Sequence, residues 1–343
     1  MSDVTPDLIF QVASGFMAAK HLFVANEIGI FEHLRAGSAT LDELAQRVAV
    51  EPRPLRIVVD AMVALGLLER FEDRYRNAPV AEIYLTGLSR VDLRAFLRYW
   101  HHIHYPRVAR LEEAVRTGRH VFAEGFTEEE QRICSEGVES HTALPANALA
   151  ATYDFSRHRR VLDLGGGTGS FMEVVLAKYL HLESTLYDFP RVIEIARKRL
   201  IGSPFEKRVR VMAGDLLKDP IPNDHDLVLL ANVNHLLSPE HNIGLLRRIR
   251  ESVPDGARLL LADTWTDPTH TRPLVPVLMA GTFLITSGEG DVYSEGEARQ
   301  WLLETGWRVV GDMVPLTAVH INLIVAETAA YETHRAANKR AAD

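Results

Sequence analysis

One short segment, residues 161–170, limits the fold of this chain more than any other. Val161–Leu164 is apolar enough for a buried strand, and it runs directly into Gly165–Gly169, a run of glycines interrupted only by a threonine. Ser170 then opens a segment, 171–179, with the composition of a helix. Glycine permits a tight turn and lets a ligand approach the backbone, while the first turn of a helix offers free N–H groups. This succession predicts the first unit of a nucleotide-binding α/β sheet.

The glycine spacing separates two kinds of ligand. A dinucleotide site needs G-x-G-x-x-G, with a third glycine where the helix presses on the strand. In this chain Ser170 or Met172 stands at that place, depending on where the count starts. The spacing Asp163-x-Gly165-x-Gly167-x-Gly169 resembles instead the pattern of enzymes that bind S-adenosylmethionine (SAM).

Two further aspartates follow predicted strands. Asp188 ends the next strand, 19 residues after Gly169, where a carboxylate can accept both ribose hydroxyls. Asp215 ends the third strand, where a carboxylate can take the adenine amino group while an apolar neighbour covers the ring. Either aspartate alone could equally cap a helix, but together at successive strand ends they favour the cofactor. The predicted cofactor-binding residues are Asp163, Gly165, Gly167, Gly169, Asp188, Asp215, Leu216 and Asn232.

The rest of the chain after residue 220 continues this alternation. Further strands are expected at 226–233, 257–263, 308–314 and 320–326, with helices at 239–252, 273–286 and 294–305. The predicted fold class is α/β: a Rossmann-like SAM methyltransferase sheet of seven strands, the last antiparallel, preceded by a mostly helical winged-helix domain.

The winged-helix prediction rests on residues 40–77. Thr40 and Glu43 occupy the positions of a capping box at the start of a helix over 41–48. A second helix over 55–65 and a hairpin of 68–71 with 75–77 follow. A DNA-binding repressor would share this pattern, but residues 40–76 carry six basic and seven acidic side chains. We therefore expect a packing or dimerisation module.

Composition excludes several other classes. The net charge of −8 argues against nucleic acid and anionic membranes as partners. The single cysteine, Cys134, rules out an intrachain disulfide framework and a cysteine zinc site, and fits a reducing cytoplasm. The amino terminus lacks the basic start and unbroken apolar run of a secretory signal. The most apolar internal stretch, 278–285, is far shorter than the roughly 20 residues that span a bilayer. We expect a cytoplasmic location.

Residues 92–153 are predicted to be helical, and they contain the run Trp100-His101-His102-Ile103-His104-Tyr105. A metal site is set aside here, because adjacent histidines point to different faces of a helix and the sequence places no carboxylate or cysteine nearby. No metal is therefore expected. We interpret the run as part of the lining of a small-molecule pocket, with solvated surface histidines as the alternative.

Together these residues resemble the metal-independent small-molecule O-methyltransferases that carry an amino-terminal winged-helix dimerisation domain. The resemblance covers residues 10–328 and rests on Tyr153–Phe155, the glycine turn, Asp188–Ile193 and Gly214-Asp215. It implies SAM as cofactor and a homodimer in which the amino-terminal segment of one subunit helps to close the partner's pocket. The implied divisions are a dimerisation domain over 1–98, a helical linker over 99–152, a catalytic domain over 153–328 and a tail over 329–343.

The resemblance also implies a general base. The family places a histidine just after the fourth strand, in a stretch that commonly reads Leu-His-Asp-Trp-Ser-Asp-Glu, and His235 falls on that position with Leu236-Leu237 in place of Asp-Trp. Of the two acidic residues that hold the base in plant members, the first matches Asp263 and the second falls on Val292, beside Asp291. The predicted catalytic residues are His235 and Asp263.

The acceptor pocket is expected between the middle helices and the helix over 279–287. A mixture of apolar, aromatic and a few polar side chains suits a planar aromatic or polyketide-like substrate. The candidate walls are Trp100, His104, Tyr105, Phe122, Met279, Phe283 and Asn322. The predicted function is methyl transfer from SAM to a hydroxyl of such a secondary metabolite. An N- or S-methyltransferase relying on proximity, and a SAM-binding protein with diverged activity, remain alternatives.

Overall fold

The structure is a computed structural model that describes residues 4–121, 126–317 and 320–329. The chain divides into two compact units. The amino-terminal unit comprises Met1–Arg107 and Phe126–His141, and the carboxy-terminal unit comprises Val108–Gly125 and Thr142–Asp343. Each unit has its own hydrophobic core. These compact units are not the same divisions as the predicted domains, whose limits at residues 98 and 152 stay a prediction.

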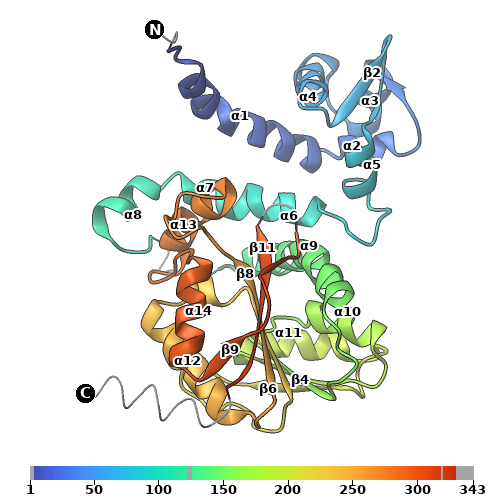
Figure 1. Cartoon of the computed structure of the whole chain (residues 1–343). Helices are drawn as coiled ribbons and strands as arrows, with labels where there is room; N and C mark the ends of the chain where they lie inside the picture. The colour runs from blue at the N-terminus through green and yellow to red at the C-terminus, as the bar shows by residue number, and fades with distance from the viewer. Residues whose placement is uncertain (1–3, 122–125, 318–319, 330–343) are drawn as a thin grey trace. The chain divides into compact units, whose positions relative to one another are not determined.

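Helices and a small sheet form the first part of the amino-terminal unit (Figure 1). Its elements are α1 (Asp7–Glu27), α2 (Ile30–Leu34), β1 (Ala39–Thr40), α3 (Leu41–Val48), α4 (Pro52–Ala64), β2 (Leu68–Phe71), β3 (Arg74–Asn77) and α5 (Pro79–Tyr84). The sheet order is β1-β3-β2, all antiparallel. The capping box of Thr40 and Glu43 is present. Helix α4 begins earlier than predicted, at Pro52, because proline is well suited to the first helical position.

The predicted helical region from residue 92 is also present. Its elements are α6 (Arg94–Tyr99), the π-helical segment η1 (Trp100–His104), α7 (Tyr105–Val108), α8 (Leu111–Thr117) and α9 (Glu128–Thr152). Within this region the π-helical turn departs from the helix that the sequence predicts, and such turns occur often at functional sites.

Helix α1 is unusual in its surface. Among the described residues it is the one helix long and apolar enough to cross a membrane, judged by length and composition only. Several of its large apolar side chains are exposed in the single chain: Leu8, Ile9, Phe10, Val12, Phe16 and Met17. Exposed apolar side chains gathered on one helix are typical of an interaction surface.

The carboxy-terminal unit is built on a mostly parallel sheet with the order β10-β11-β8-β7-β4-β5-β6, and β9 also pairs with β11. The strands are β4 (Arg160–Leu164), β5 (Glu183–Asp188), β6 (Val209–Ala213), β7 (Leu227–Ala231), β8 (Arg258–Thr264), β9 (Trp307–Val309), β10 (Val314–Pro315) and β11 (Ile321–Thr328). The antiparallel last strand is confirmed by the pairing of β11 with β8. The predicted strand over 308–314 is instead two short strands, because Gly311 interrupts it with a left-handed φ of 75°.

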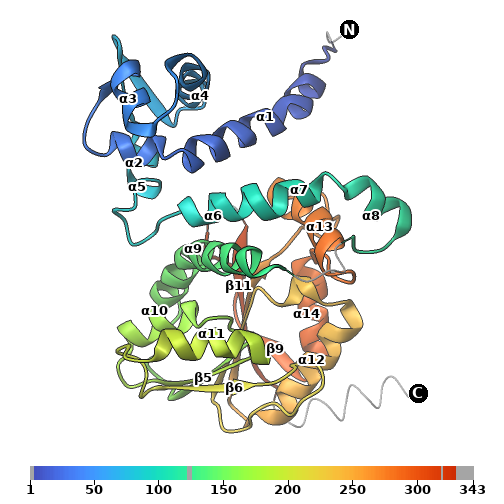
Figure 2. The same cartoon turned by 180° about the vertical axis from the view of Figure 1, so that it is seen from behind.

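Helices cover both faces of this sheet. They are α10 (Ser170–Lys178), α11 (Pro190–Leu200), η2 (Asn234–Leu236), α12 (Pro239–Ser252), α13 (Leu274–Thr286) and α14 (Glu295–Glu304). Figures 1 and 2 show α10 and α11 on one side and α12 and α14 on the other. Successive residues of β4 point to opposite faces of the sheet. Leu162 packs in the hydrophobic cluster that includes α12 and α14, and Val161 packs in the one that includes α9 and α10.

The strand order positions a site. Strands β4 and β7 are neighbours, and the chain leaves β4 towards β5 but leaves β7 towards β8, in the opposite direction. In open α/β sheets ligands bind at such a switch point, beyond the carboxyl ends of the strands. The glycine turn, Asp188, Asp215, His235 and Asp263 all come from carboxyl ends of strands or the turns that follow them.

Candidate active site

The glycine turn after β4 is shaped by left-handed backbone at three positions. Gly165, Gly167 and Gly169 have φ of 74°, 61° and 93°, a region that other residues enter at a cost. The Gly165 N–H donates to the Tyr187 carbonyl at 2.8 Å, which ties the turn to β5. Gly166 is needed for a different reason: a Cβ there would collide with the Asp163 carboxyl and the Leu186 side chain. The sequence prediction omitted Gly166, because its neighbour Leu186 comes from another strand.

Asp188 contacts the glycine turn, whereas its predicted contact with ribose hydroxyls stays a prediction. Its Oδ2 accepts the Gly167 N–H at 2.8 Å, and its Oδ1 accepts the Phe189 N–H at 2.7 Å. Burial raises the pKa of this carboxyl, and the two backbone N–H donors act in the opposite direction. The carboxylate therefore both braces the turn and stands at the carboxyl end of β5.

Asp163 is the most buried carboxyl of the site. Its side chain is fully covered, and neither oxygen has a hydrogen-bond partner among the described residues. Burial, and secondarily the charge of Asp188, raise the pKa of Asp163 to about 8. Two unpartnered buried oxygens beside a glycine turn are polar groups that a ligand can satisfy.

The other predicted cofactor residues lie nearby in the same unit. Leu216 is buried, and its Cδ2 would lie 3.3 Å from a Cβ at Gly165. Asp215 accepts the Leu217 N–H at 2.9 Å and pairs with Lys218 at 3.1 Å, and the backbone hydrogen bond lowers its pKa. Asn232 follows β7 with a left-handed φ of 56°. Among the described residues, no hydrogen bond joins the side chain of Asp215 or Asn232 to the turn, and their cofactor roles stay predictions.

His235 and Asp263 form a tight pair. The His235 Nδ1 lies 2.6 Å from Asp263 Oδ1, with Asp263 at the end of β8 only 1% exposed and the imidazole 13% exposed. The same Oδ1 accepts the Thr264 N–H at 2.7 Å, and Oδ2 lies 3.4 Å from the His235 backbone N–H. A carboxylate on Nδ1 holds the proton there, which leaves the lone pair of the neutral ring on Nε2.

Two other residues pack against His235, one on its ring and one on its backbone. The Phe283 ring of α13 stacks on the imidazole, with centroids 4.0 Å apart and an interplanar angle of 19°. Gly290 packs so closely on the His235 carbonyl oxygen that a Cβ there would collide with it. Neither contact was predicted as such, although Phe283 was predicted as a pocket wall.

The second acidic partner does not reach His235 among the described residues. Val292, the residue on that position, is buried, and Asp291 turns its carboxylate to the Val292 N–H at 2.7 Å. The nearby Glu289 pairs with His241 at 2.9 Å instead. Asp263 is thus the one carboxylate whose contact with the His235 ring is present in this part of the chain.

The predicted acceptor walls are divided between the units. Phe122 lies outside the described residues. Met279 and Phe283 lie one helical turn apart on α13, and Asn322 of β11 stands directly across from Asp263 in the sheet register. These three lie in the carboxy-terminal unit, with Phe283 touching His235. Their acceptor-binding roles stay predictions.

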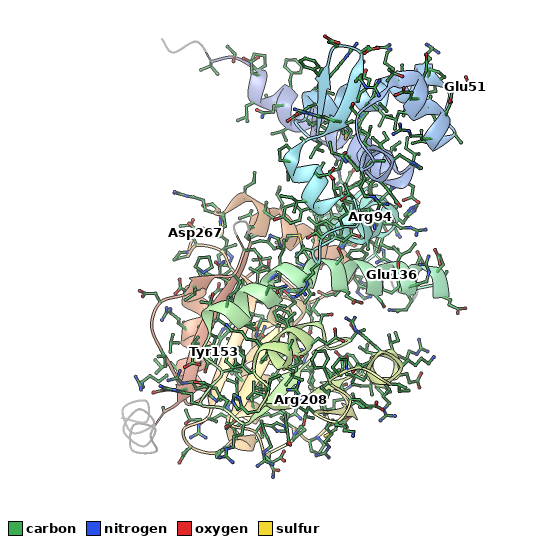
Figure 3. The ribbon with its side chains drawn as sticks, turned by 90° about the vertical axis from the view of Figure 1, so that its right-hand side faces the viewer. Glu51, Arg94, Glu136, Tyr153, Arg208 and Asp267 are labelled. Atoms are coloured by element: carbon green, nitrogen blue, oxygen red, sulfur yellow. The ribbon has the colours of Figure 1, made fainter. Side chains whose placement is uncertain are left out.

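The remaining three walls belong to the amino-terminal unit. His104 is buried edge-on against Tyr99, with centroids 4.6 Å apart, and burial followed by the Arg107 charge lowers the pKa of His104 to about 4. Trp100 packs on Phe96 and His104. Tyr105 lies edge-on to Phe23. Figure 3 labels Arg94 and Glu136 of this unit, and Tyr153 of the carboxy-terminal unit.

Comparison with known proteins bears on this arrangement. An O-methyltransferase domain model matches residues 109–308, and an O-methyltransferase dimerisation domain model matches residues 10–87. The 3-hydroxy-5-methyl-1-naphthoate 3-O-methyltransferase of Streptomyces sahachiroi is 32% identical over 311 residues, covering 88% of this chain and 89% of that protein. The N,N-dimethyltransferase OxyT of Streptomyces rimosus is 29% identical over 312 residues, with 88% and 90% covered.

A solved structure agrees with these matches. Human N-acetylserotonin methyltransferase in complex with SAM superposes with a TM-score of 0.84 at 26% identity, covering 96% of this chain and 100% of that chain. The match extends over both units of the chain, so the α/β sheet and the winged-helix unit occur together in that protein.

Proposed function

Because the chain belongs to the SAM-dependent O-methyltransferase family with an amino-terminal dimerisation domain, we propose that it methylates a hydroxyl of a small aromatic or polyketide-like secondary metabolite, with His235 as general base. The observation that carries the proposal is the His235–Asp263 pair, which follows strands β7 and β8 in the sheet that also carries the glycine turn.

SAM fits the residues present. The unpartnered oxygens of Asp163, the left-handed glycines and the carboxylate of Asp188 form a polar cradle at the end of β4 and β5. Asp163, the turn and Asp188 would hold the cofactor, with Asp215 and Leu216 at its adenine end. When bound, SAM supplies an electrophilic methyl group on a sulfonium. The chain's own task is to hold an acceptor in line with that group and to receive its proton.

The proton has a defined destination. Asp263 keeps the Nδ1–H of His235 in place, so Nε2 can accept the hydroxyl proton while the acceptor oxygen gains the methyl group. Asp263 also stabilises the imidazolium that results, since it is buried and close. Phe283 restricts the ring to one orientation by stacking on it. General-base assistance of this kind contributes roughly 10²- to 10⁴-fold to the rate.

The dimerisation domain supports a homodimer. We assign the exposed apolar side chains of α1, which include Phe10, Phe16 and Met17, to that interface, because these side chains are exposed in the single chain. The amino-terminal segment of one subunit would then help to close the partner's acceptor pocket. Size-exclusion chromatography with light scattering tests the dimer, and Phe16→Glu, which puts a charge among the exposed side chains of α1, should shift it towards monomer.

One experiment tests the reaction and its alternatives. The enzyme is incubated with methyl-labelled SAM and a panel of hydroxynaphthoates, simpler phenols, aromatic thiols and amines, and the products are identified by mass spectrometry. Label on a phenolic oxygen supports the proposal. The similarity to an N,N-dimethyltransferase favours amines as the second candidate acceptor class, so transfer to nitrogen alone would replace the hydroxyl proposal. No transfer to any member, despite SAM binding, would contradict both.

The role of His235 is tested separately. His235→Gln removes the base but keeps a polar side chain of comparable size. Single-turnover methylation of a phenol by this variant should be slower by roughly 10²-fold or more, with the SAM dissociation constant unchanged. A rate near that of the wild type would leave His235 as a pocket residue only.

A further inference from the structure

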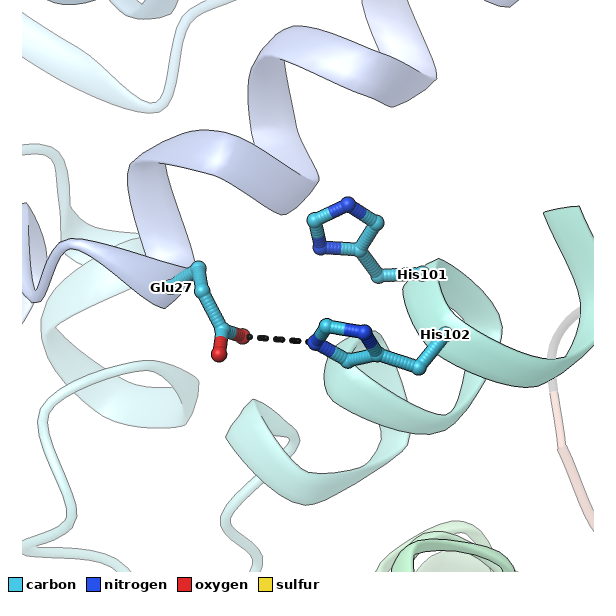
Figure 4. A group of neighbouring side chains, drawn as sticks. All are labelled: Glu27, His101 and His102. Carbon is cyan, nitrogen blue, oxygen red and sulfur yellow. Dashed lines mark ion pairs between the residues drawn. The ribbon is translucent and has the colours of Figure 1, made fainter. Parts of the chain in front are cut away.

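Two adjacent histidines in the amino-terminal unit converge instead of diverging. The imidazoles of His101 and His102 stack with centroids 4.5 Å apart and an interplanar angle of 24° (Figure 4). They lie in the π-helical segment η1, whose wider turn rotates successive side chains by less than an α-helix does. The first ground for setting aside a metal site, that neighbouring histidines face different ways, does not hold in this segment.

The second ground, the lack of a nearby carboxylate, fails as well. Glu27, at the end of α1, directs its Oε2 to the His102 Nε2 at 3.4 Å, as Figure 4 shows. One ligand atom from each of Glu27, His101 and His102 lies within 4.8 Å of the others. Ligands bound to zinc at about 2.0–2.2 Å are separated by somewhat more than 3 Å. The His102–Glu27 pair already has that spacing, and His101 needs only a small side-chain adjustment.

One ring nitrogen of His101 has no hydrogen-bond partner among the described residues. Lys20 Nζ lies 2.7 Å from Nε2 of this ring, while Nδ1 is buried without a hydrogen-bond partner. The ring is held from the other side by Phe23, stacked at 5.6 Å. Burial, followed by the charges of Lys20 and His102, lowers the pKa of His101. Glu27 Oε1 lies 3.8 Å from Arg98, so Oε2 is the oxygen left for a cation.

We propose that Glu27, His101 and His102 form a binding site for a divalent transition metal such as Zn²⁺. The bound ion would join the end of α1 to the segment η1. Two imidazoles and one carboxylate suit Zn²⁺, with water in the fourth position. His101 contributes Nδ1, His102 contributes Nε2 and Glu27 contributes Oε2. The site lies within the amino-terminal unit.

Lys20 competes with the metal. While the ammonium donates to Nε2 of His101, the proton of the neutral ring sits on Nδ1, where the metal has to bind. Metal binding moves that proton to Nε2, which then faces the ammonium as a second donor, so Lys20 has to swing away. Lys20→Met removes this competition and should strengthen metal binding.

The test uses the full chain without a histidine tag, freed of metal with a chelator and dialysed. Zn²⁺ is titrated by calorimetry, and Co²⁺ serves as a spectroscopic probe, since its visible bands report imidazole coordination. The variants are Glu27→Gln and His102→Ala. The matched control is His241→Ala, because His241 also pairs with a glutamate, Glu289, at 2.9 Å but has no second histidine in that pair. Far-UV circular dichroism checks that each variant is folded.

The expected result is one Zn²⁺ per chain with a dissociation constant of about 10 μM or tighter, weakened at least about tenfold in both site variants and unchanged in His241→Ala. Tighter binding by Lys20→Met would support the competition. Binding weaker than about 100 μM in the wild type, or equal affinity in folded His102→Ala, would overturn the proposal. A loss in His241→Ala comparable to that in His102→Ala would overturn it too, because the ion would then belong to surface histidines in general.

Discussion

The substitution Asp263→Asn isolates the charge behind His235 with little change in shape. The asparagine Oδ1 can still accept the His235 Nδ1–H and the Thr264 N–H, which Asp263 Oδ1 accepts at 2.6 Å and 2.7 Å. The amide nitrogen takes the place of Oδ2, which lies 3.4 Å from the His235 backbone N–H, so two donors would face each other there. The main loss is the negative charge that stabilises the imidazolium.

The magnitude follows from the kind of hydrogen bond that changes. A hydrogen bond to a charged group contributes about 1.5–3 kcal/mol and a neutral one about 0.5–1.5 kcal/mol, so the exchange costs roughly 1–2 kcal/mol. If this difference is expressed in the transition state, methyl transfer slows by roughly 5- to 30-fold. The assay is single-turnover methylation of a phenol, with enzyme in excess over labelled SAM. SAM affinity, measured by calorimetry, should stay within about twofold.

The double variant His235→Gln/Asp263→Asn is the control. If Asp263 acts through His235, the double variant is no slower than His235→Gln alone, because the charge then has no imidazolium to stabilise. Two outcomes would refute the reasoning: a rate for Asp263→Asn equal to that of the wild type, or losses that multiply in the double variant.

Three further predictions concern the folded chain. Because the pKa of Asp163 is raised to about 8, the folded chain keeps a proton that the unfolded chain releases, and this penalty on stability grows as the pH rises from about 4 to about 8. The free energy of unfolding of Asp163→Asn, measured in denaturant titrations without SAM, should therefore rise relative to that of the wild type across that pH window, by a few kcal/mol in order of magnitude. A difference between the two proteins that does not depend on pH would contradict the prediction. Gly166→Ala should lower the free energy of unfolding by about 1–3 kcal/mol, because the new Cβ collides with neighbouring side chains. The Cβ of Gly167→Ala meets open space, so this variant should lose about 1–2 kcal/mol through its left-handed φ alone. Equal free energies of unfolding for Gly166→Ala and the wild type in denaturant would show that the turn relaxes. Thr40→Ala removes half of the capping box and should lower the free energy of unfolding, measured by thermal unfolding, by about 1 kcal/mol. SAM affinity in calorimetry should not change. An unchanged free energy of unfolding would show that the cap lies outside the part of the chain that unfolds cooperatively.

The parts of the site that were predictable depend on one stretch of backbone at a time. The glycine turn needs left-handed φ at Gly165, Gly167 and Gly169, and only glycine adopts it freely, so the residue type reports the geometry. Asp188 was predictable because parallel strands end at one edge of the sheet, which brings its Oδ2 to the Gly167 N–H. The position of His235 came from family resemblance, and its pairing with Asp263 agrees with that alignment.

The parts that were not predictable depend on side chains that meet from separate elements. Gly166 is required by Leu186 of β5, and nothing in the local sequence reports that neighbour. The histidine run shows the same limit more sharply. Its interpretation assumed that His101 and His102 diverge, as they do in an α-helix, but in the π-helical segment their rings stack on each other. Glu27, the carboxylate beside them, is distant in sequence and reaches them only through the packing of α1. Both the stacking of the two rings and the approach of the carboxylate depend on side-chain conformation and on packing between elements, and periodicity over so short a run reports neither.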